Sequence, residues 1–581
     1  MVHICDLLVS MHFAKEFFVI LYRVDLQKKY LMAMKKKFDY LILGGGSAGC
    51  TLASRLSKNT NINVALIEAG GGGKNLFIRM PAGNGFVFGN SKLDWGYNST
   101  PQKALHGRQI YLPRGKGLGG SSNMNGMIYM RGVKRDYDNW AEMGLDGWGY
   151  NDMLRFFKKS ESSKYRRDQW HGSFGPLATE PSRNFGTLEK AFIEASIKAG
   201  HMYIDDFNGP FRTGAGRTDS MIKNGIRQSS NIAYLSTKPK NLTLFKNCHV
   251  KRILIKKDKA IGIETVEGTK IYSEREVIIC QGAFGTPQTL LLSGIGPESH
   301  LRDFNIPVHV NLPGVGSNLA DHVNVSIQYG STRKDLSLAR FQRLDKAISL
   351  LTRWLIFKSG PGSGAFFSTI IFHALKDVSL PELQIYMTPM IIDENLTSKA
   401  EETTPLLERL GKKIFARGRK VAKPGIQIDI NQMRPKSSGS VRLTSTNPLD
   451  HPLIDLNYYQ NKSDLKELIE GVKVMRDVMS KNEISKYHSG ELPPFRNASS
   501  DSEIEAAIYK NTYSGHHPCS TARMGPDTDR LSVLDTNLKV RGIDNLRVCD
   551  ASAFPTQITG NLNATVIAFA EKAAEIILAG N

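Results

Sequence analysis

A glycine-rich turn that begins at residue 44 is the first pattern in the chain that predicts a chemical role. The apolar run 38–43 is followed by Gly44, Gly46 and Gly49, which fit the pattern G-x-G-x-x-G between a strand and a helix. Such glycines allow a tight turn, bring the backbone close to a pyrophosphate and let the helix pack on the strand. The N-terminus of the helix then faces the phosphates.

A carboxylate at the end of the next predicted strand supports the same interpretation. Residues 63–67 form a second apolar run, and Glu68 follows it at about the expected separation of 20 residues from the glycines. A carboxylate at this position accepts hydrogen bonds from the hydroxyls of an unphosphorylated adenosine ribose. The two features together predict a dinucleotide site in preference to a purely structural turn.

The same turn also matches a different class of enzyme. Gly45, Ser47 and Gly49 fit the G-x-S-x-G nucleophile elbow of α/β-hydrolases, and His517 follows late in the chain, as that fold requires. Two features oppose this reading. The turn follows the first predicted strand of its domain, and Glu68 has no role in a hydrolase. A hydrolase with Ser47 as nucleophile therefore stays as a remote alternative.

Three further segments carry a resemblance to a known family. The stretch 112–126, continuing through Tyr129, closely resembles the first signature of the glucose-methanol-choline (GMC) oxidoreductases, which are flavoproteins that oxidise alcohols. The stretch 282–296 resembles the second signature, although Thr289 stands where an aliphatic residue is usual. A third likeness lies at 439–443, and the resemblance extends from Phe38 to Ala579.

The resemblance implies FAD as the cofactor. The loop Gly119-Gly120-Ser121 offers backbone N–H groups and a hydroxyl without bulk, which suits a pyrophosphate and the edge of an isoalloxazine ring. Some members bind the flavin covalently through a histidine at the position of Met124, and because a thioether cannot form that bond, we expect non-covalent FAD. The remaining positions implied to contact the cofactor are Asn125, Val250, Asp550 and Ala551.

The C-terminal block 515–563 resembles the active-site half of the family. A histidine four residues before a threonine faces the flavin in that family, and here His517 precedes Thr521. Its partner in the family is a histidine or an asparagine, which corresponds to Asn561. The resemblance implies that His517 accepts the hydroxyl proton while hydride leaves for flavin N5, since imidazole titrates near neutrality. Asn561 cannot titrate, so we expect it to orient the alcohol oxygen.

One position bears on the substrate. The segment 313–322 resembles choline-oxidising members, which carry a glutamate two residues after the Asp-His pair, whereas this chain has Asn324. A neutral amide cannot pair with a quaternary ammonium, so we expect a neutral primary alcohol that is oxidised to an aldehyde, with choline as the alternative. The resemblance favours a quinone or another acceptor over oxygen.

The motifs predict a mixed α/β chain, an α+β composite, with a Rossmann-like FAD-binding domain that is discontinuous in sequence. A sheet-containing substrate-binding domain fills the gaps. Strands are expected at 382–387 and 426–430, and helices at 465–479 and 563–579. The predicted parts are an N-terminal extension at 1–34, FAD-binding segments at 35–170, 236–325 and 515–581, and substrate-binding segments at 171–235 and 326–514.

Composition limits the compartment and the partners. The 581 residues carry a formal net charge of +21, yet the densest basic run, 409–423, has few aromatic residues to stack on bases. Nucleic acid is therefore not expected as a partner. Six widely spaced cysteines without zinc-type spacing predict a reduced, intracellular protein without a metal site.

The first 34 residues precede every motif of the chain. Their apolar patches are interrupted by charges, so they predict neither a transmembrane helix nor a secretory signal. We expect them to be an upstream extension of a chain whose natural start is Met34. A peripheral membrane helix is the alternative. We expect a cytoplasmic protein, and the alternative prediction is contact with the cytoplasmic face of the membrane.

Overall fold

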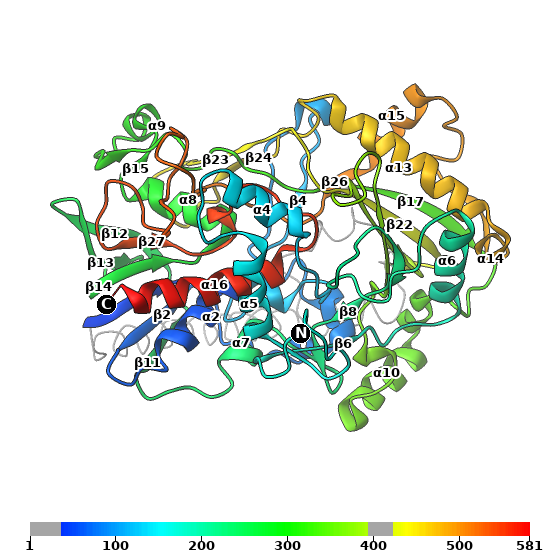
Figure 1. Ribbon diagram of the computed structural model, residues 1–581, viewed down its shortest axis with the longest axis horizontal. Helices are drawn as coiled ribbons and strands as arrows, with labels where there is room; N and C mark the ends of the chain where they lie inside the picture. Colours follow the sequence, from blue (N-terminus) through cyan, green and yellow to red (C-terminus); the bar gives the residue numbers. More distant parts are fainter. Residues whose placement is uncertain (1–36, 393–421, 581) are drawn as a thin grey trace, which may run out of the picture.

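The computed structural model describes residues 37–392 and 422–580. The predicted extension at 1–34 and most of the basic run at 409–423 lie outside these residues. Within the described ranges the chain builds two large sheets with helices packed on them (Figure 1). The longer helices are α2 (Ser47–Leu56), α4 (Lys134–Glu142), α5 (Tyr150–Ser160), α6 (Thr187–Lys198), α8 (Gly282–Leu292), α10 (Leu344–Phe357), α13 (Ser463–Ser480), α15 (Asp501–Asn511) and α16 (Leu562–Ala579).

The first sheet is largely parallel and carries the glycine turn. Its order is β11-β2-β1-β14-β13-β12, and β27 also pairs with β14. The strands β11, β2, β1, β14 and β27 run parallel, while β12 and β13 form an antiparallel hairpin beside β14. Their bounds are β1 (Lys37–Leu43), β2 (Val64–Glu68), β11 (Leu242–Lys246), β12 (Val250–Lys256), β13 (Lys259–Thr265), β14 (Lys270–Ile279) and β27 (Leu546–Val548).

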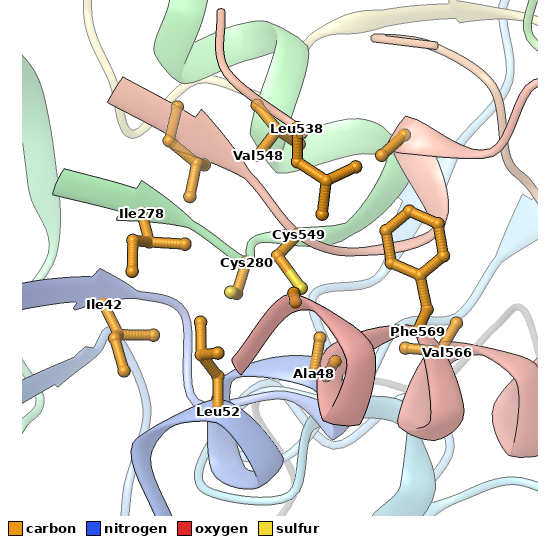
Figure 2. Close-up of a cluster of buried hydrophobic side chains, with 14 of the residues drawn as sticks. Ile42, Ala48, Leu52, Ile278, Cys280, Leu538, Val548, Cys549, Val566 and Phe569 are labelled. Carbon is orange, nitrogen blue, oxygen red and sulfur yellow. The ribbon is translucent and has the colours of Figure 1, made fainter. Parts of the chain in front are cut away.

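The core of this part lies between the parallel strands and the helices α2 and α16. Figure 2 shows Ile42 of β1 and Ile278 of β14 on the same side of the cluster as Leu52 of α2, and Val566 and Phe569 of α16 on its other side. Strands covered on both faces read as continuous apolar runs, which is why β1 and β2 were recognisable in the sequence. Helices α2 and α16 pack together although they come from opposite ends of the chain (Figure 1).

The second sheet is antiparallel and has two chemically different faces. Its order is β25-β17-β22-β19-β18-β7, and β26 also pairs with β17. Along β22, the alternate residues Ile426, Ile428 and Ile430 enter a core that includes α13, so the residues between them face the other way. The bounds are β7 (Gly214–Arg217), β17 (Val323–Ser331), β18 (Thr369–His373), β19 (Leu383–Thr388), β22 (Gly425–Gln432), β25 (His488–Glu491) and β26 (Thr512–Ser514).

The mixed α/β fold with a Rossmann-like sheet is confirmed. The expected strands at 38–43, 382–387 and 426–430 correspond to β1, β19 and β22, and the expected helices correspond to α13 and α16. The first sheet draws its strands from residues 37–68, 242–279 and 546–548, so it is discontinuous in sequence. The second sheet includes β17, which begins at Val323, before the predicted boundary at residue 326. The exact domain boundaries stay predictions.

Candidate active site

One cavity of about 890 Å³ joins the glycine turn to the C-terminal block and to the second sheet. It is lined by glycine backbone at one end and by His517 and Asn561 further along. The predicted site residues that line it are Gly44, Gly46, Ser47, Glu68, Gly120, Ser121, Asn125, Val250, Asn324, His517, Asp550, Ala551 and Asn561. Gly49 and Gly119 do not line it.

The glycines of the turn differ in what surrounds them. Gly44 has φ +97°, and a Cβ there would lie 2.5 Å from the carbonyl oxygen of Cys280. A Cβ on Gly49 would lie 1.9 Å from the carbonyl oxygen of Gly44, so this glycine permits the close packing of helix on strand. A Cβ on Gly46 would meet protein no nearer than 3.9 Å, and the space beside it belongs to the cavity.

The first turn of α2 leaves hydrogen-bond donors toward this space. The helix begins at Ser47, and its N-cap residue Gly46 supplies no side-chain acceptor. The first N–H groups of a helix lack partners inside the helix and carry a partial positive charge. An uncapped N-terminus beside an open glycine is therefore suited to an anionic phosphate.

Glu68 is buried at the end of β2 and lines the cavity. Its Oε2 accepts the N–H of Gly45 at 2.8 Å, and its Oε1 accepts those of Gly70 at 2.7 Å and Gly117 at 3.0 Å. A carboxylate offers about four lone-pair positions, so three backbone donors leave room for a further hydroxyl. Burial raises the pKa of Glu68, and the three backbone donors oppose that shift.

The loop 119–125 packs against the glycine turn. A Cβ on Gly120 would lie 2.7 Å from the Cα of Gly46, so this close approach requires glycine at position 120. Gly119 has φ +104°, and its role is to form the turn. Asn125 accepts hydrogen bonds from the buried Arg227 at both its side-chain and its backbone oxygen, 2.9 and 2.7 Å away.

The C-terminal segment closes the cavity near α8. Asp550 accepts from the N–H of Gly282 at 2.8 Å and from the hydroxyl of Thr286 at 2.6 Å, so its carboxylate fixes the start of that helix. Burial raises the pKa of Asp550. Ala551 and Val250 present small apolar surfaces to the cavity.

Ser47 and Met124 bear on two of the expectations from the sequence. The hydroxyl of Ser47 donates to Oδ1 of Asn563 at 2.7 Å, while both ring nitrogens of His517 contact other residues. Within the described ranges no imidazole contacts Ser47, so the hydrolase arrangement is not present there. Met124 is buried, and it lines the cavity at the position where some members of the family carry a histidine.

His517 forms contacts through both its backbone and its ring. Its backbone N–H donates to Oδ1 of Asp321 at 2.7 Å, and its backbone carbonyl accepts from the side-chain amide of Gln557 at 3.0 Å. Its Nε2 lies 3.1 Å from Nδ2 of Asn561, and its Nδ1 lies 2.9 Å from Nδ1 of His322. Burial, followed by the neighbouring His322, lowers the pKa of His517 well below the usual range, so the ring is neutral at neutral pH.

His322 is a residue of the site that the sequence did not single out. Its Nε2 lies 3.0 Å from the carbonyl oxygen of Ile558, which can only accept, so Nε2 carries the hydrogen. Burial lowers the pKa of His322 to about 3, so its Nδ1 is an unprotonated acceptor. His517 must then carry its hydrogen on Nδ1, and its Nε2 presents a lone pair.

Asn561 is fixed by residues of the second sheet. Its Oδ1 accepts from Gln384 and from the hydroxyl of Tyr386, both at 3.2 Å, while its Nδ2 lies 2.9 Å from that hydroxyl. Gln384 and Tyr386 lie on β19, so the sheet positions the amide beside His517. Neither residue was identified from the sequence, because nothing local marks them.

Asn324 lies on β17, within the same cavity and on the polar face of the second sheet. It is 6% exposed, and its Oδ1 has no hydrogen-bond partner among the described residues. The structure thus places a neutral amide in the cavity.

Comparisons with known proteins identify the family. A family model described as GMC oxidoreductase matches residues 38–324, and its C-terminal counterpart matches residues 435–570. The chain belongs to the GMC oxidoreductase family. It is 35% identical over 553 residues to an oxygen-dependent choline dehydrogenase of Photobacterium profundum, with 94% of each chain covered. An enzyme of the same name from Brucella anthropi is 36% identical over 93% of this chain and 95% of its own.

Solved structures of GMC flavoenzymes share the fold. A formate oxidase of Aspergillus oryzae superposes with a TM-score of 0.83 at 26% identity, covering 94% of this chain and 99% of its own. A pyridoxine 4-oxidase from Mesorbium loti gives a TM-score of 0.78 at 27% identity, over 93% and 98%. The chain is therefore an oxidoreductase of this flavoprotein family with a Rossmann-like FAD-binding fold.

The residues that line this cavity fit FAD. Gly46 with its open space, the uncapped start of α2 and Glu68 with its remaining lone pairs all line the cavity.

In the described residues, no helix is long and apolar enough to cross a membrane.

Proposed function

We propose that this GMC oxidoreductase oxidises a primary alcohol to an aldehyde with FAD, and that Nε2 of His517 accepts the hydroxyl proton. The observation that carries the proposal is the pairing of an unprotonated imidazole nitrogen with a fixed amide, 3.1 Å apart, in the cavity that also contains the glycine turn. Alcohol oxidation needs a proton acceptor and a hydrogen-bond donor at one oxygen.

The cofactor would be held by residues from all three segments of the Rossmann-like part. We assign the phosphates to Gly46 and the start of α2, and the adenosine ribose to Glu68. When bound, FAD supplies an acceptor for the hydride of the alcohol carbon. We propose non-covalent binding, because the side chain at position 124 is a methionine. The further cofactor contacts proposed are Gly44, Ser47, Gly120, Ser121, Asn125, Val250, Asp550 and Ala551, with Gly49 and Gly119 shaping the turns.

A single atom of the protein, Nε2 of His517, would accept the proton. His517 Nε2 takes the hydroxyl proton, and the imidazolium that forms keeps its Nδ1–H bond to His322. Asp321, which accepts the backbone N–H of His517, holds the backbone at this residue in place. Because the pKa of His517 is lowered by burial, the base is unprotonated before the reaction begins.

The amide of Asn561 complements this base. Nδ2 donates toward His517 Nε2 and toward the hydroxyl of Tyr386, so it can turn one of its hydrogens to an alcohol oxygen at the same place. A donor held by β19 stabilises the negative charge that develops on that oxygen.

Two substrate classes follow from different observations. Asn324 supplies no charge, which supports a neutral primary alcohol, whereas the relatives named as choline dehydrogenases support choline as the second candidate. We propose a quinone or another non-oxygen electron acceptor; the relatives' name includes oxygen dependence, so oxygen is the alternative to test. A cytoplasmic location stays a prediction, with peripheral contact to the cytoplasmic face of the membrane as its alternative.

The test is an anaerobic titration of the FAD-loaded protein, followed by its visible absorption. Bleaching of the flavin bands by a primary alcohol is expected. Mixing the reduced protein with oxygen or with a soluble quinone then separates the two acceptors. An FAD-loaded protein that no primary alcohol bleaches, choline included, would overturn the proposal.

A further inference from the structure

Asp429 is a buried carboxylate in the same cavity as His517 and Asn561, and it has no role in the proposed proton transfer. It lies on β22, is 3% exposed and lines the cavity. Its Oδ1 accepts hydrogen bonds from the hydroxyls of Ser326 and Tyr513 and, at 2.9 Å, from the amide of Gln427. Three neutral donors thus orient the group.

The second oxygen of this carboxylate has no partner in the part of the chain that the structure describes. Within residues 37–392 and 422–580, the hydrogen bonds to Asp429 all reach Oδ1, and no Lys, Arg or His side chain forms an ion pair with Oδ2. Buried carboxylates in proteins are normally paired with a cation or with a metal, because an isolated buried charge is costly. Burial raises the pKa of Asp429, which expresses the same cost. A cationic group that enters the cavity would offset this free-energy cost.

The register of the second sheet places this carboxylate close to the reacting end. Asp429 lies directly opposite Tyr386 on β19 and opposite Ser326 on β17. Neighbouring strands are about 4.8 Å apart, and the hydroxyl of Tyr386 contacts Asn561, which contacts His517. The carboxylate is therefore one strand away from the tyrosine that positions the proposed alcohol oxygen.

The surrounding surface also suits an organic cation. The rings of Phe366, Phe367 and Tyr386 line the same cavity, and the last two lie with their centroids 5.4 Å apart. Aromatic faces attract ammonium groups, and they exclude the water that would screen the carboxylate.

We propose that Asp429 binds the ammonium group of a short amino or quaternary-ammonium alcohol, and so determines the specificity of the site. This inference rests on the proposed alcohol oxidation. Asn324 itself carries no charge, but Asp429 supplies one from the adjacent strand. Asp429 lies two residues from Asn431, which is the cross-strand partner of Asn324.

The experiment compares choline with its uncharged carbon isostere, 3,3-dimethylbutan-1-ol, as reductants of the FAD-loaded full chain under anaerobic conditions. In the unsubstituted protein, kcat/KM for choline is expected to exceed that of the isostere by about 100-fold or more. In Asp429→Asn that preference is expected to disappear through a loss confined to choline. Glu382→Gln, a buried carboxylate outside the cavity, is the matched control and is expected to keep it.

The outcomes separate the two proposals. Equal reduction by both compounds in the unsubstituted protein, or an unchanged preference in Asp429→Asn, would overturn the assignment of Asp429 and leave alcohol oxidation standing. Failure of both compounds and of other primary alcohols to reduce the flavin would instead overturn the proposed function. FAD content and melting temperature of Asp429→Asn report whether it has folded, and the comparison of the two reductants in the unsubstituted protein does not depend on that variant.

Discussion

Nδ1 of His517 and Nδ1 of His322 lie 2.9 Å apart, although the two residues come from segments 195 positions apart in the chain. A hydrogen bond between two Nδ1 atoms requires one ring to donate and the other to accept. The carbonyl of Ile558 decides which, because it obliges His322 to carry its hydrogen on Nε2. His322 is thus a positioning residue that directs the lone pair of His517 into the cavity.

Replacing His322 tests this arrangement. In His322→Phe the acceptor for Nδ1–H is lost, so His517 is free to carry its hydrogen on Nε2, where it cannot accept a proton. We expect flavin reduction to slow by about 10-fold to 100-fold, with a smaller change in KM. Nitrogen-15 NMR of His517 is expected to show Nε2 unprotonated in the unsubstituted protein and a mixture in the variant.

A matched control exists in a second histidine pair. His201 Nε2 lies 3.2 Å from His373 Nδ1, and neither residue lines the cavity. His201→Phe makes the same chemical change and should leave the reduction rate as it was. An unaltered rate and an unaltered His517 tautomer in His322→Phe would show that the contact has no directing role.

The pH dependence of stability offers a second readout of His322. Its pKa is lowered to about 3 by burial, whereas an unfolded histidine titrates near 6.5, so between these values only the unfolded state binds the proton. The contribution of this residue to stability therefore falls as pH falls through that window, by up to about 1.4 kcal/mol per pH unit.

Measuring the difference between two proteins isolates that contribution. Buried carboxylates such as Glu68 and Asp550 have raised pKa values and act in the opposite direction. Denaturant unfolding of the unsubstituted protein and of His322→Phe at pH 7 and pH 5.5 is expected to show a stability gap that narrows on acidification. A gap that is constant or that widens would contradict a neutral, buried His322.

Glu68 is predicted to govern cofactor affinity. Glu68→Gln replaces one carboxylate oxygen by an N–H₂ group among three backbone N–H donors, which should disturb the turn and remove an acceptor for the ribose. We expect the Kd for FAD to rise by about 10-fold or more, since hydrogen bonds to charged groups are worth about 1.5–3 kcal/mol. Flavin fluorescence measures it, and retention of the original Kd would exclude the ribose assignment.

The packing role of Gly49 can be separated from cofactor binding. A methyl group at Gly49 would lie 1.9 Å from the carbonyl oxygen of Gly44, whereas at Gly72 it would meet only the flexible side chain of Lys246, at 3.7 Å. Gly49→Ala is expected to destabilise the protein by about 1–3 kcal/mol and Gly72→Ala by much less. Similar melting temperatures for the two variants would count against this packing.

The sequence predicted those parts of the site that depend on local pattern. The turn after β1, the carboxylate at the end of β2 and the apolar helix α16 are each written in consecutive residues, so a single sequence is enough to find them. The catalytic candidates His517 and Asn561 came from resemblance, because nothing in their own neighbourhoods distinguishes them from buried structural residues.

Contacts between distant segments could not be predicted in the same way. His322 was visible only as one residue of a motif, and its pairing depends on how β17 meets the C-terminal block. Asp429 did have a local signal: alternation along β22 put Ile426, Ile428 and Ile430 on one face, so the polar residues between them had to share the other. The groups that surround this face come from distant segments of the chain, so only the folded structure shows them.

The central claim, that His517 is the base of an FAD-dependent alcohol oxidation, is tested most directly by anaerobic stopped-flow reduction of the flavin in the unsubstituted protein and in His517→Ala, each loaded with FAD. A primary alcohol or choline is expected to bleach the flavin of the unsubstituted protein, and the variant should do so about 100-fold or more slowly while it keeps its FAD. Equal rates in the two proteins would contradict the assignment of His517.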